Sequence, residues 1–327
     1  MELVTTIAAL VVAAIAVAFA FRPRARALPA AAAAAVPAPP LPKRPGPLDV
    51  AAPYKLVASR HGWMLVNPND MYLGRAILDY GECCQTEVEF LLRLLALRSG
   101  DVVEIGANIG THTVPMAKAL AREGRRLTVF EPQPFIFQNL CANIALNGLH
   151  NVRAWPFACG ERETMLHFAQ PDYGSSGNFG GISMTPARSG GTVAVPCRTL
   201  DSIVAGDAIG LIKVDVEGFE LRALQGAEAT LDRCRPLLYV ENDRIEESPA
   251  LVEWLWAKNY RLWWHTPLLF NADNFFANPE NCYEGTGSFN MLCVPREESL
   301  EVKDLFEVLT GTHPLAQRQA QPPGANS

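Results

Sequence analysis

The sequence has few clustered basic residues and no internal repeat. Beyond Arg44 no run of Lys and Arg occurs, and the 28 basic residues against 34 acidic ones give a net charge of −6. Nucleic acid attracts proteins through clustered positive charge, so no nucleic-acid partner is predicted. Apolar residues make up 49% of the chain, which excludes disorder of the whole protein and supplies a sizeable core.

Paired cysteines at metal-binding spacing are also lacking. None of the eight cysteines forms a CxxC pair, although Cys83 and Cys84 are adjacent. We interpret them as buried thiols in a reducing compartment rather than as a disulfide framework or a zinc site.

Charge is absent from residues 3–21, whose helix would be about 28 Å long, close to the thickness of a bilayer core. Arg22, Arg24 and Arg26 follow, and the positive-inside rule then places the downstream chain in the cytoplasm. Residues 1–26 are therefore predicted to form a hydrophobic N-terminal helix that anchors a single-pass membrane protein. A cleaved signal peptide, whose positive charge normally comes first, and a soluble N-terminus are the alternatives.

The composition changes twice after this segment. Residues 27–53 are rich in Ala and Pro and are predicted to be an extended linker, with plain disorder as the alternative. Residues 54–298 have the composition of a globular domain. Residues 299–327 are predicted to be a tail, with one short helix at 300–309 and disorder from 317 onward.

Strand-like and helix-like segments alternate within the globular part. The predicted strands are 102–105, 127–130, 152–158, 209–216, 237–240, 260–264 and 291–294. The predicted helices are 87–97, 113–122, 135–146, 219–231 and 251–258. Such alternation indicates an α/β fold, in which helices cover both faces of a mostly parallel sheet. Ligands of these folds bind at the carboxyl ends of the strands.

The stretch "VVEIGANIGTHT" (102–113) leads from a predicted strand into a predicted helix. Gly106 and Gly110 permit a sharp turn and close approach of a ligand, and Glu104 offers a carboxylate to a positive group. The dinucleotide fingerprint G-x-G-x-x-G is not met, because Asn108 and Thr111 stand at its second and third glycines. S-adenosylmethionine, which carries an ammonium and no phosphate, fits this turn better. A merely structural turn is the alternative.

Glu131 ends the second predicted strand, in "VFEPQP". A carboxylate there can accept hydrogen bonds from both ribose hydroxyls of a nucleoside, although a solvated strand end would look the same. Ala158, at the end of the third strand, is placed beside the adenine by position alone.

A second acidic group follows in "LIKVDVEGFE" and "LYVENDR". Alternation places Lys213, Asp215 and Glu217 on one face of a strand, and Glu241 and Asn242 end the next one. Asp215 or Glu217 could remove a proton from the acceptor, and Glu241 and Asn242 could bind it. The same oxygens could hold Mg²⁺, or form an ion-pair network around Lys213. No metal is predicted.

Further candidates lie outside the core pattern. Tyr80 and Glu82 are predicted to cap the cofactor and contact the acceptor, and His265 is a candidate base beside a structural alternative. Asn271 and Asn274 lie among phenylalanines, as in sugar sites, although turn asparagines look alike. Residues 174–191, which contain six glycines, are interpreted as a flap.

Together these stretches resemble the FkbM family of S-adenosylmethionine-dependent methyltransferases; "CRTLDSI" and "GWMLVNPNDMYLGRAILDYGE" also match. The resemblance covers about residues 54–296. It implies a Rossmann-like class I fold of seven mostly parallel strands with an antiparallel last strand. By motif match the cofactor-binding residues are Glu104, Gly106, Asn108, Gly110 and Glu131, and the "DVEG" signature carries to Asp215, Glu217 and Gly218.

The resulting hypothesis is a methyltransferase that uses S-adenosylmethionine to methylate a hydroxyl of a small-molecule, glycan or lipid-linked acceptor. Its catalytic domain would lie on the cytoplasmic side of the membrane. A nicotinamide-dependent oxidoreductase and a catalytically silent, membrane-tethered binding module are the alternatives. The sequence does not set the oligomeric state.

Overall fold

The computed structural model describes residues 46–186 and 191–319, all within one compact unit that begins at residue 45. The predicted anchor (1–26) and most of the predicted linker lie outside the described residues. Within the described ranges no helix has both the length and the apolar character needed to cross a membrane. The predicted domain boundaries at residues 54 and 298 stay predictions.

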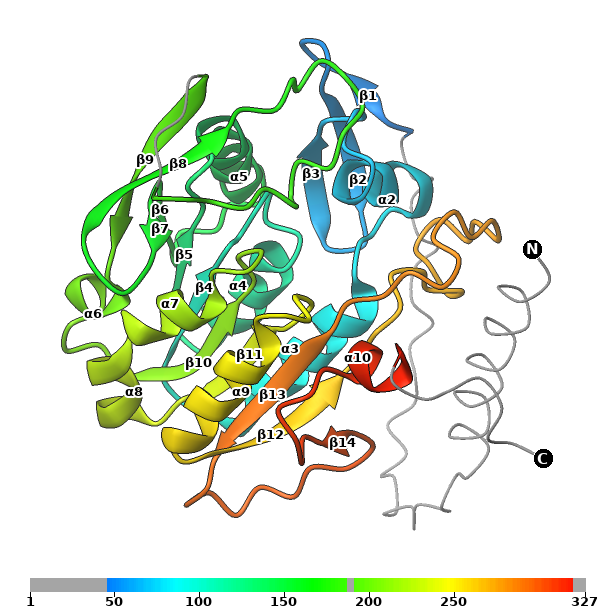
Figure 1. The fold of residues 1–327 in the computed structure, drawn as a ribbon. Helices are drawn as coiled ribbons and strands as arrows, with labels where there is room; N and C mark the ends of the chain where they lie inside the picture. Colours follow the sequence, from blue (N-terminus) through cyan, green and yellow to red (C-terminus); the bar gives the residue numbers. More distant parts are fainter. Residues whose placement is uncertain (1–45, 187–190, 320–327) are drawn as a thin grey trace, which may run out of the picture. The chain divides into compact units, whose positions relative to one another are not determined.

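A central sheet of eight strands runs in the order β14-β12-β13-β11-β10-β4-β5-β6 (Figure 1). Its strands are β4 (Asp101–Ile105), β5 (Leu127–Phe130), β6 (Val152–Trp155), β10 (Ile209–Val214), β11 (Leu237–Glu241), β12 (Tyr260–His265), β13 (Asn290–Pro295) and β14 (Phe306–Glu307). Five neighbours, from β11 to β6, are parallel, and β13 is antiparallel to both β11 and β12. The predicted mostly parallel sheet is confirmed, with one short strand more than the expected seven.

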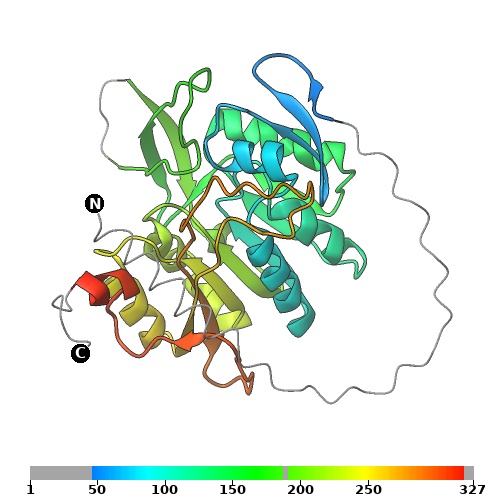
Figure 2. The same ribbon diagram turned by 90° about the vertical axis from the view of Figure 1, so that its right-hand side faces the viewer.

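Helices cover both faces of this sheet, as Figures 1 and 2 show. One face packs against α3 (Gln85–Leu97), α4 (Thr113–Ala121) and α5 (Pro134–Leu146). The other packs against α6 (Leu200–Ile203), α7 (Glu220–Gln225), α8 (Glu228–Cys234) and α9 (Ser248–Ala257). Within β4, Val102 belongs to the first core and Val103 to the second. Burial of both faces explains the uninterrupted apolar runs of the strands.

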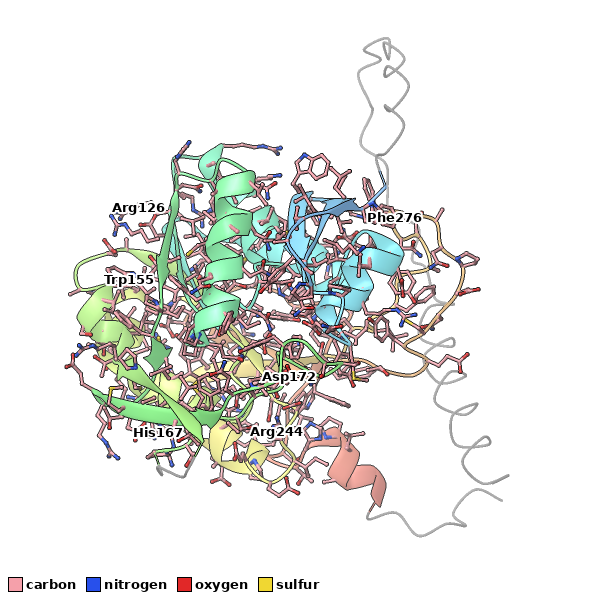
Figure 3. All side chains as sticks on the ribbon, turned by 90° about the horizontal axis from the view of Figure 1, so that it is seen from above. Arg126, Trp155, His167, Asp172, Arg244 and Phe276 are labelled. Atoms are coloured by element: carbon pink, nitrogen blue, oxygen red, sulfur yellow. The ribbon has the colours of Figure 1, made fainter. Side chains whose placement is uncertain are left out.

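Two small sheets flank the central one. β1 (Leu48–Asp49), β2 (Lys55–Ser59) and β3 (Gly62–Val66) form the first, beside α2 (Leu73–Tyr80). β7 (Ala158–Cys159), β9 (Thr192–Arg198) and β8 (Thr164–Ala169) form the second. Figure 3 shows Trp155, at the β6 edge of the central sheet, far across the view from Phe276, which follows β12.

Three predicted elements were wrong in the middle of the chain. The predicted strand 152–158 ends at Trp155, because Pro156 cannot donate to the ladder, and Ala158 joins another sheet. The predicted helix 219–231 is two helices. They part at Gly226, where a Cβ atom would lie 2.0 Å from the carbonyl oxygen of Gly160. β10 ends at Val214, not at residue 216.

The predicted helix 300–309 was also wrong. Phe306 and Glu307 form β14 against β12 instead, and Leu300, Val302 and Leu305 pack on the core. An available sheet edge outweighed the weak helical propensity of this segment. Helix α10 (Pro314–Gln319) extends over residues 317–319, which were predicted to be disordered, while 320–327 lie outside the described residues. All eight cysteines are free thiols, but the prediction that they are buried is wrong for Cys282, which is exposed.

Candidate functional site

A cavity of about 470 Å³ opens at the carboxyl ends of β4, β5, β10 and β11, where the sequence predicted a ligand site. The predicted residues that line it are Gly106, Asn108, Glu131, Ala158, Asp215, Glu217 and Glu241. Parallel strands bring these residues together although they lie far apart in the sequence.

The glycine turn lies at the end of β4. Gly106 has φ +88°, and a Cβ atom there would be 1.8 Å from the backbone oxygen of Asp215. Glycine is therefore required because two strand-end turns meet at this point, in addition to any ligand that approaches. Gly110 also has a positive φ (+93°), but it faces Leu140 and does not line the cavity.

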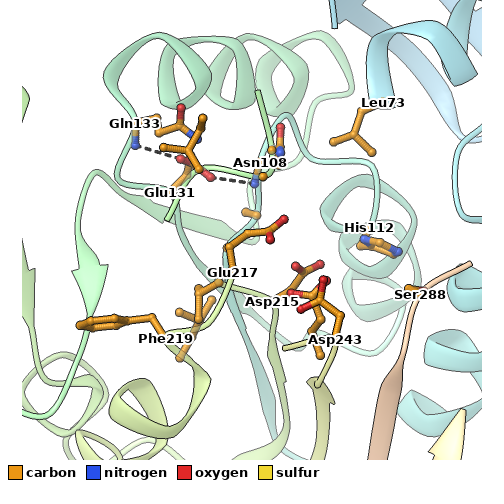
Figure 4. Close-up of a pocket in the computed structure, with 18 of the residues that line it drawn as sticks. Leu73, Asn108, His112, Glu131, Gln133, Asp215, Glu217, Phe219, Asp243 and Ser288 are labelled. Atoms are coloured by element: carbon orange, nitrogen blue, oxygen red, sulfur yellow. Dashed lines mark hydrogen bonds between the residues drawn. The ribbon is translucent and has the colours of Figure 1, made fainter. Parts of the chain in front are cut away.

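Glu131 directly follows β5 and is the main polar side chain at the end of that strand. Its Oε2 accepts a hydrogen bond from the backbone N–H of Asn108 (3.0 Å), and its Oε1 accepts one from Gln133 N–H (2.9 Å) (Figure 4). Each carboxylate oxygen keeps capacity for a further donor on the cavity side. Glu131 is 4% exposed, and burial raises the pKa of its carboxyl to about 7. The arrangement can receive two adjacent hydroxyls.

Apolar side chains continue the wall beyond Glu131. They are Phe157, Leu166, Ile182, Met184 and Phe219, next to Ala158. Asn178 and Gly180–Gly181 also line the cavity, so part of the predicted flap lies at the site. The sequence did not indicate Phe157 or Phe219. The flat ring of a base fits between such side chains.

Glu104 lies behind the cavity wall, not on it. The side chain is fully buried, and its Oε2 accepts a hydrogen bond from Thr113 Oγ1 (2.6 Å). Lys213 Nζ lies 4.0 Å from Glu104 Oε1 and 2.9 Å from Asp215 Oδ2. Burial opposes the charge of Lys213, but Asp215, Glu104 and Glu87 outweigh it and raise the pKa of the ammonium. The predicted contact of Glu104 with a ligand ammonium therefore has no geometric support, and the ion pair left open for Lys213 is present.

Three carboxylates gather at the ends of β10 and β11. Glu217, Glu241 and Asp243 each place one oxygen within 4.8 Å of the other two. Because β10 ends at Val214, Glu217 lies in the following turn, with φ +54°, and not on a strand face with Lys213 as predicted. Arg244 donates a hydrogen bond to Glu217. Burial, together with Asp215 and Asp243, raises the pKa of Glu217 to about 7. This wall favours a cation or a shared proton.

His265 does not line the cavity. Its Nδ1 lies 2.7 Å from the hydroxyl of Tyr239, and its ring stacks on Phe90 at 4.3 Å. Burial lowers the pKa of His265 to about 4. The structural alternative for His265 fits this position, and the predicted catalytic role does not.

Five other predicted residues hold loops around the cavity without lining it. Glu82 accepts hydrogen bonds from Asn271 Nδ2 (2.7 Å), from Phe275 N–H (2.8 Å) and from Arg60. Tyr80 donates its hydroxyl to the Glu280 carbonyl (2.8 Å).

Asn274 bonds to the Asn278 carbonyl (2.7 Å), and Asn242 to Ser248 Oγ (3.0 Å). The contact of Asn274 lies within residues 266–289, from which Leu269, Thr286 and Ser288 reach the cavity, whereas that of Asn242 joins the end of β11 to the start of α9.

Sequence reasoning missed Glu87, His112 and Ser288, which line the side of the cavity toward α3. Figure 4 shows His112 and Ser288 across the cavity from Glu131 and Phe219. His112 stands within the quoted glycine motif, so a signal was present. No sequence motif pointed to Glu87 or Ser288, which are 201 residues apart.

Comparison with known proteins gives the following. Residues 104–262 match the family described as Methyltransferase FkbM domain. The solved FkbM methyltransferase of Methylobacillus flagellatus is 17% identical, with a TM-score of 0.39, over 60% of this chain and 43% of its own. The chain thus spans less than half the length of that relative.

Two other solved structures are similar. The O-methyltransferase TomG of Streptomyces achromogenes, in complex with S-adenosylmethionine, is 13% identical over 64% of this chain and 79% of its own, with a TM-score of 0.40. Precorrin-6y C5,15-methyltransferase of Geobacter metallireducens is 10% identical over 64% of this chain and 89% of its own, with a TM-score of 0.40. No curated protein matches. The family match confirms the predicted resemblance, the methyltransferase class and the S-adenosylmethionine donor.

Proposed function

We propose that this chain, whose residues 104–262 match the FkbM methyltransferase domain, methylates a hydroxyl of a small-molecule, glycan or lipid-linked acceptor. The observation that carries the proposal is the Glu131 carboxylate, fixed by the backbone amides of Asn108 and Gln133 at the mouth of a cavity. It is built to accept a ribose diol, and the side chain of Asn108 stands where a dinucleotide would need bare backbone.

The lining residues set the direction of the donor in this proposal. Its ribose would bind Glu131, and its adenine would lie near Ala158, between Phe157 and Phe219. Its methionine end would then point toward Asp215, at the carboxylate-rich ends of β10 and β11. S-adenosylmethionine supplies an electrophilic methyl group on a sulfonium centre. The acidic wall stabilises the positive charges of this end, and the protein aligns the acceptor oxygen with the methyl carbon.

Calorimetry tests the donor part of the proposal. S-adenosylhomocysteine should bind the full chain and NADH should not. The reverse result would favour the nicotinamide-dependent oxidoreductase. Transfer of a labelled methyl group should then be measured with a panel of monosaccharides, phenols and polyols. Binding without transfer to any member of a broad panel would favour the silent binding module.

We extend the proposal to the location of the protein. Residues 3–21 are uncharged and three arginines follow, which supports a membrane anchor and a cytoplasmic catalytic domain. The free thiols agree with a reducing compartment. Deleting residues 1–26 should give a soluble chain that still binds S-adenosylhomocysteine, while the full chain should partition into membranes. A soluble full-length chain would remove the anchor and, with it, the argument for a lipid-linked acceptor.

A further inference from the structure

We propose that His112, held by the buried carboxylate of Glu87, is the general base that removes the proton of the acceptor hydroxyl. The inference rests on the proposed function and names a residue for its proton-transfer step. It stands on the geometry of one wall of the cavity, to which α3, the start of α4 and the loop before β13 each contribute a residue.

The contacts of Glu87 fix it in place. Its Oε1 accepts hydrogen bonds from the Ser288 hydroxyl and from Asn290 Nδ2 (3.2 Å), and its Oε2 lies 3.3 Å from His112 Nε2. Glu87 is 4% exposed and His112 is 7% exposed. Although burial opposes ionisation, His112 and Ser288 lower the pKa of Glu87 to about 2, so the carboxylate is charged at neutral pH. A fixed, ionised carboxylate is what orients an imidazole for proton transfer.

One ring nitrogen of His112, Nδ1, is free to contact a ligand in the cavity. Nε2 is buried and lies 3.3 Å from Glu87 Oε2 without completing a hydrogen bond, and no hydrogen bond of Nδ1 is present among the described residues. Because His112 lines the cavity, Nδ1 is the nitrogen available to an acceptor. The other charged groups packed around the pair are Glu104, Lys213 and Asp215, which neutralise one another in part.

The three bases predicted from the sequence are already engaged or misplaced. Asp215 is bonded to Lys213, and Glu217 to Arg244. His265 lies outside the cavity. His112 alone among these four combines cavity access, an orienting carboxylate and an unpaired nitrogen.

The acceptor oxygen forms a bond to the methyl carbon while the carbon–sulfur bond breaks, its electron pair going to sulfur. The hydroxyl proton passes to Nδ1 of His112. The products are a methyl ether and S-adenosylhomocysteine, and the imidazolium, stabilised by Glu87, later releases its proton to water.

Kinetics of His112→Ala test the role, with the acceptor that the wild-type chain methylates in the panel above. We expect kcat to fall by about 10²–10⁴-fold with the affinity for S-adenosylhomocysteine within about twofold, and the rise of rate with pH to be lost. Added imidazole should restore part of the turnover. Glu87→Gln should lower kcat less. The exposed His150→Ala serves as the matched control.

Three results would overturn the proposal. If kcat stays unchanged in His112→Ala, the side chain is not the base. If the affinity for S-adenosylhomocysteine falls by more than about tenfold in a folded variant, His112 holds the donor instead. Loss of rate that imidazole cannot rescue, together with a lowered unfolding temperature, would assign the pair a structural role.

Chemical modification decides the same point without any acceptor, and so separates failure of this inference from failure of the proposed function. Diethyl pyrocarbonate acylates accessible, neutral imidazole nitrogens. Peptide mass spectrometry should find His112 modified under conditions that modify His150, and His265 protected. An unmodified His112 would show that its nitrogen does not reach the cavity, and the proposal would fall even if methyl transfer is observed.

Discussion

On the β4–β5 side of the cavity, backbone groups hold the polar side chain. Glu131 is fixed by the N–H groups of Asn108 and Gln133, both within the loops that follow the two strands. On the β10–β11 side and along α3, side chains hold one another across long stretches of sequence. Arg244 binds Glu217, and Ser288 binds Glu87. The hydrogen bonds to Glu131 come from the backbone, so they do not depend on the identity of the side chains at 108 and 133. The contacts of Glu217 and Glu87 need the particular side chains of Arg244 and Ser288.

The difference matches the two tasks of a methyltransferase. The donor is the same molecule in every turnover, so its site can be formed by short strand-end turns. The acceptor varies between enzymes, and a wall assembled from separate segments can change one segment at a time. We therefore expect mutations of the two sides to have different kinds of effect.

The largest effect should come from breaking the turn where the two sides meet. Gly106→Ala adds a Cβ atom 1.8 Å from the Asp215 carbonyl oxygen at φ +88°. We expect it to lower the free energy of unfolding by more than about 3 kcal/mol, measured by chemical denaturation. Gly124→Ala, at φ +67° with open space around it, is the matched control and should cost about 1 kcal/mol. Equal losses would mean that backbone strain alone is measured.

A second change tests the donor side directly. Glu131→Ala removes the acceptor of two ribose hydrogen bonds, so the affinity for S-adenosylhomocysteine should fall by about 10–100-fold in calorimetry. Glu253→Ala, an exposed residue of α9, should leave it unchanged. Unchanged affinity in Glu131→Ala would mean that the ribose binds elsewhere, and that the β4–β5 side of the cavity is not the donor side.

The pH dependence of the same affinity sharpens this test. Burial raises the pKa of Glu131 to about 7, so the free protein carries a protonated carboxyl below that pH. Since the ribose hydroxyls need the ionised form, S-adenosylhomocysteine should bind about tenfold more weakly at pH 6 than at pH 8. In Glu131→Gln the affinity should not vary with pH in this range. A wild-type affinity that is flat with pH would contradict the assignment.

Stability should respond to pH in the opposite direction. A carboxyl whose pKa is raised on folding stabilises the folded state most below the usual value of 4.5 and loses this contribution as pH rises to about 7. The free energy of unfolding of the wild-type chain should therefore fall relative to that of Glu131→Gln across this window. Denaturation of both chains at several pH values measures the difference.

The smallest effect is expected on the acidic side. Arg244 and Lys213 already supply positive charge to Glu217 and Asp215. Treatment with EDTA should therefore change methyl transfer by less than about twofold. Loss of activity that Mg²⁺ restores would turn the group of Glu217, Glu241 and Asp243 into a metal site.

The predictability of the site from the sequence follows the same division. Strand periodicity and the glycine turn located Gly106, Asn108 and Glu131, because a strand end and its turn are local features. The same reasoning misplaced Glu104, since a strand residue one position from the tip can point away from the cavity. It also placed His265 in the site. Whether a strand-end side chain turns toward the ligand depends on packing against Tyr239 and Phe90, which no local pattern contains.

The α3 side of the cavity could not have been found by such reasoning. Glu87 looked like one charged position on an amphipathic helix, and its partners Ser288 and Asn290 lie about 200 residues later, in the loop before β13 and at the first residue of β13. The fold itself was more predictable, because its apolar runs are long. It failed where a single residue, such as Pro156 or Gly226, divided a run.

The ties of Glu82 have a consequence for engineering. Its carboxylate joins Arg60, from the turn between β2 and β3, to Asn271 and the backbone of Phe275, which both belong to the loop 266–289. A chimera that receives residues 266–289 from a relative, in order to exchange acceptor preference, would replace the partners of Glu82 in this loop while keeping Arg60 and Glu82 of the present chain. Positions 60 and 82 should therefore be changed in the same chimera to the residues of that relative.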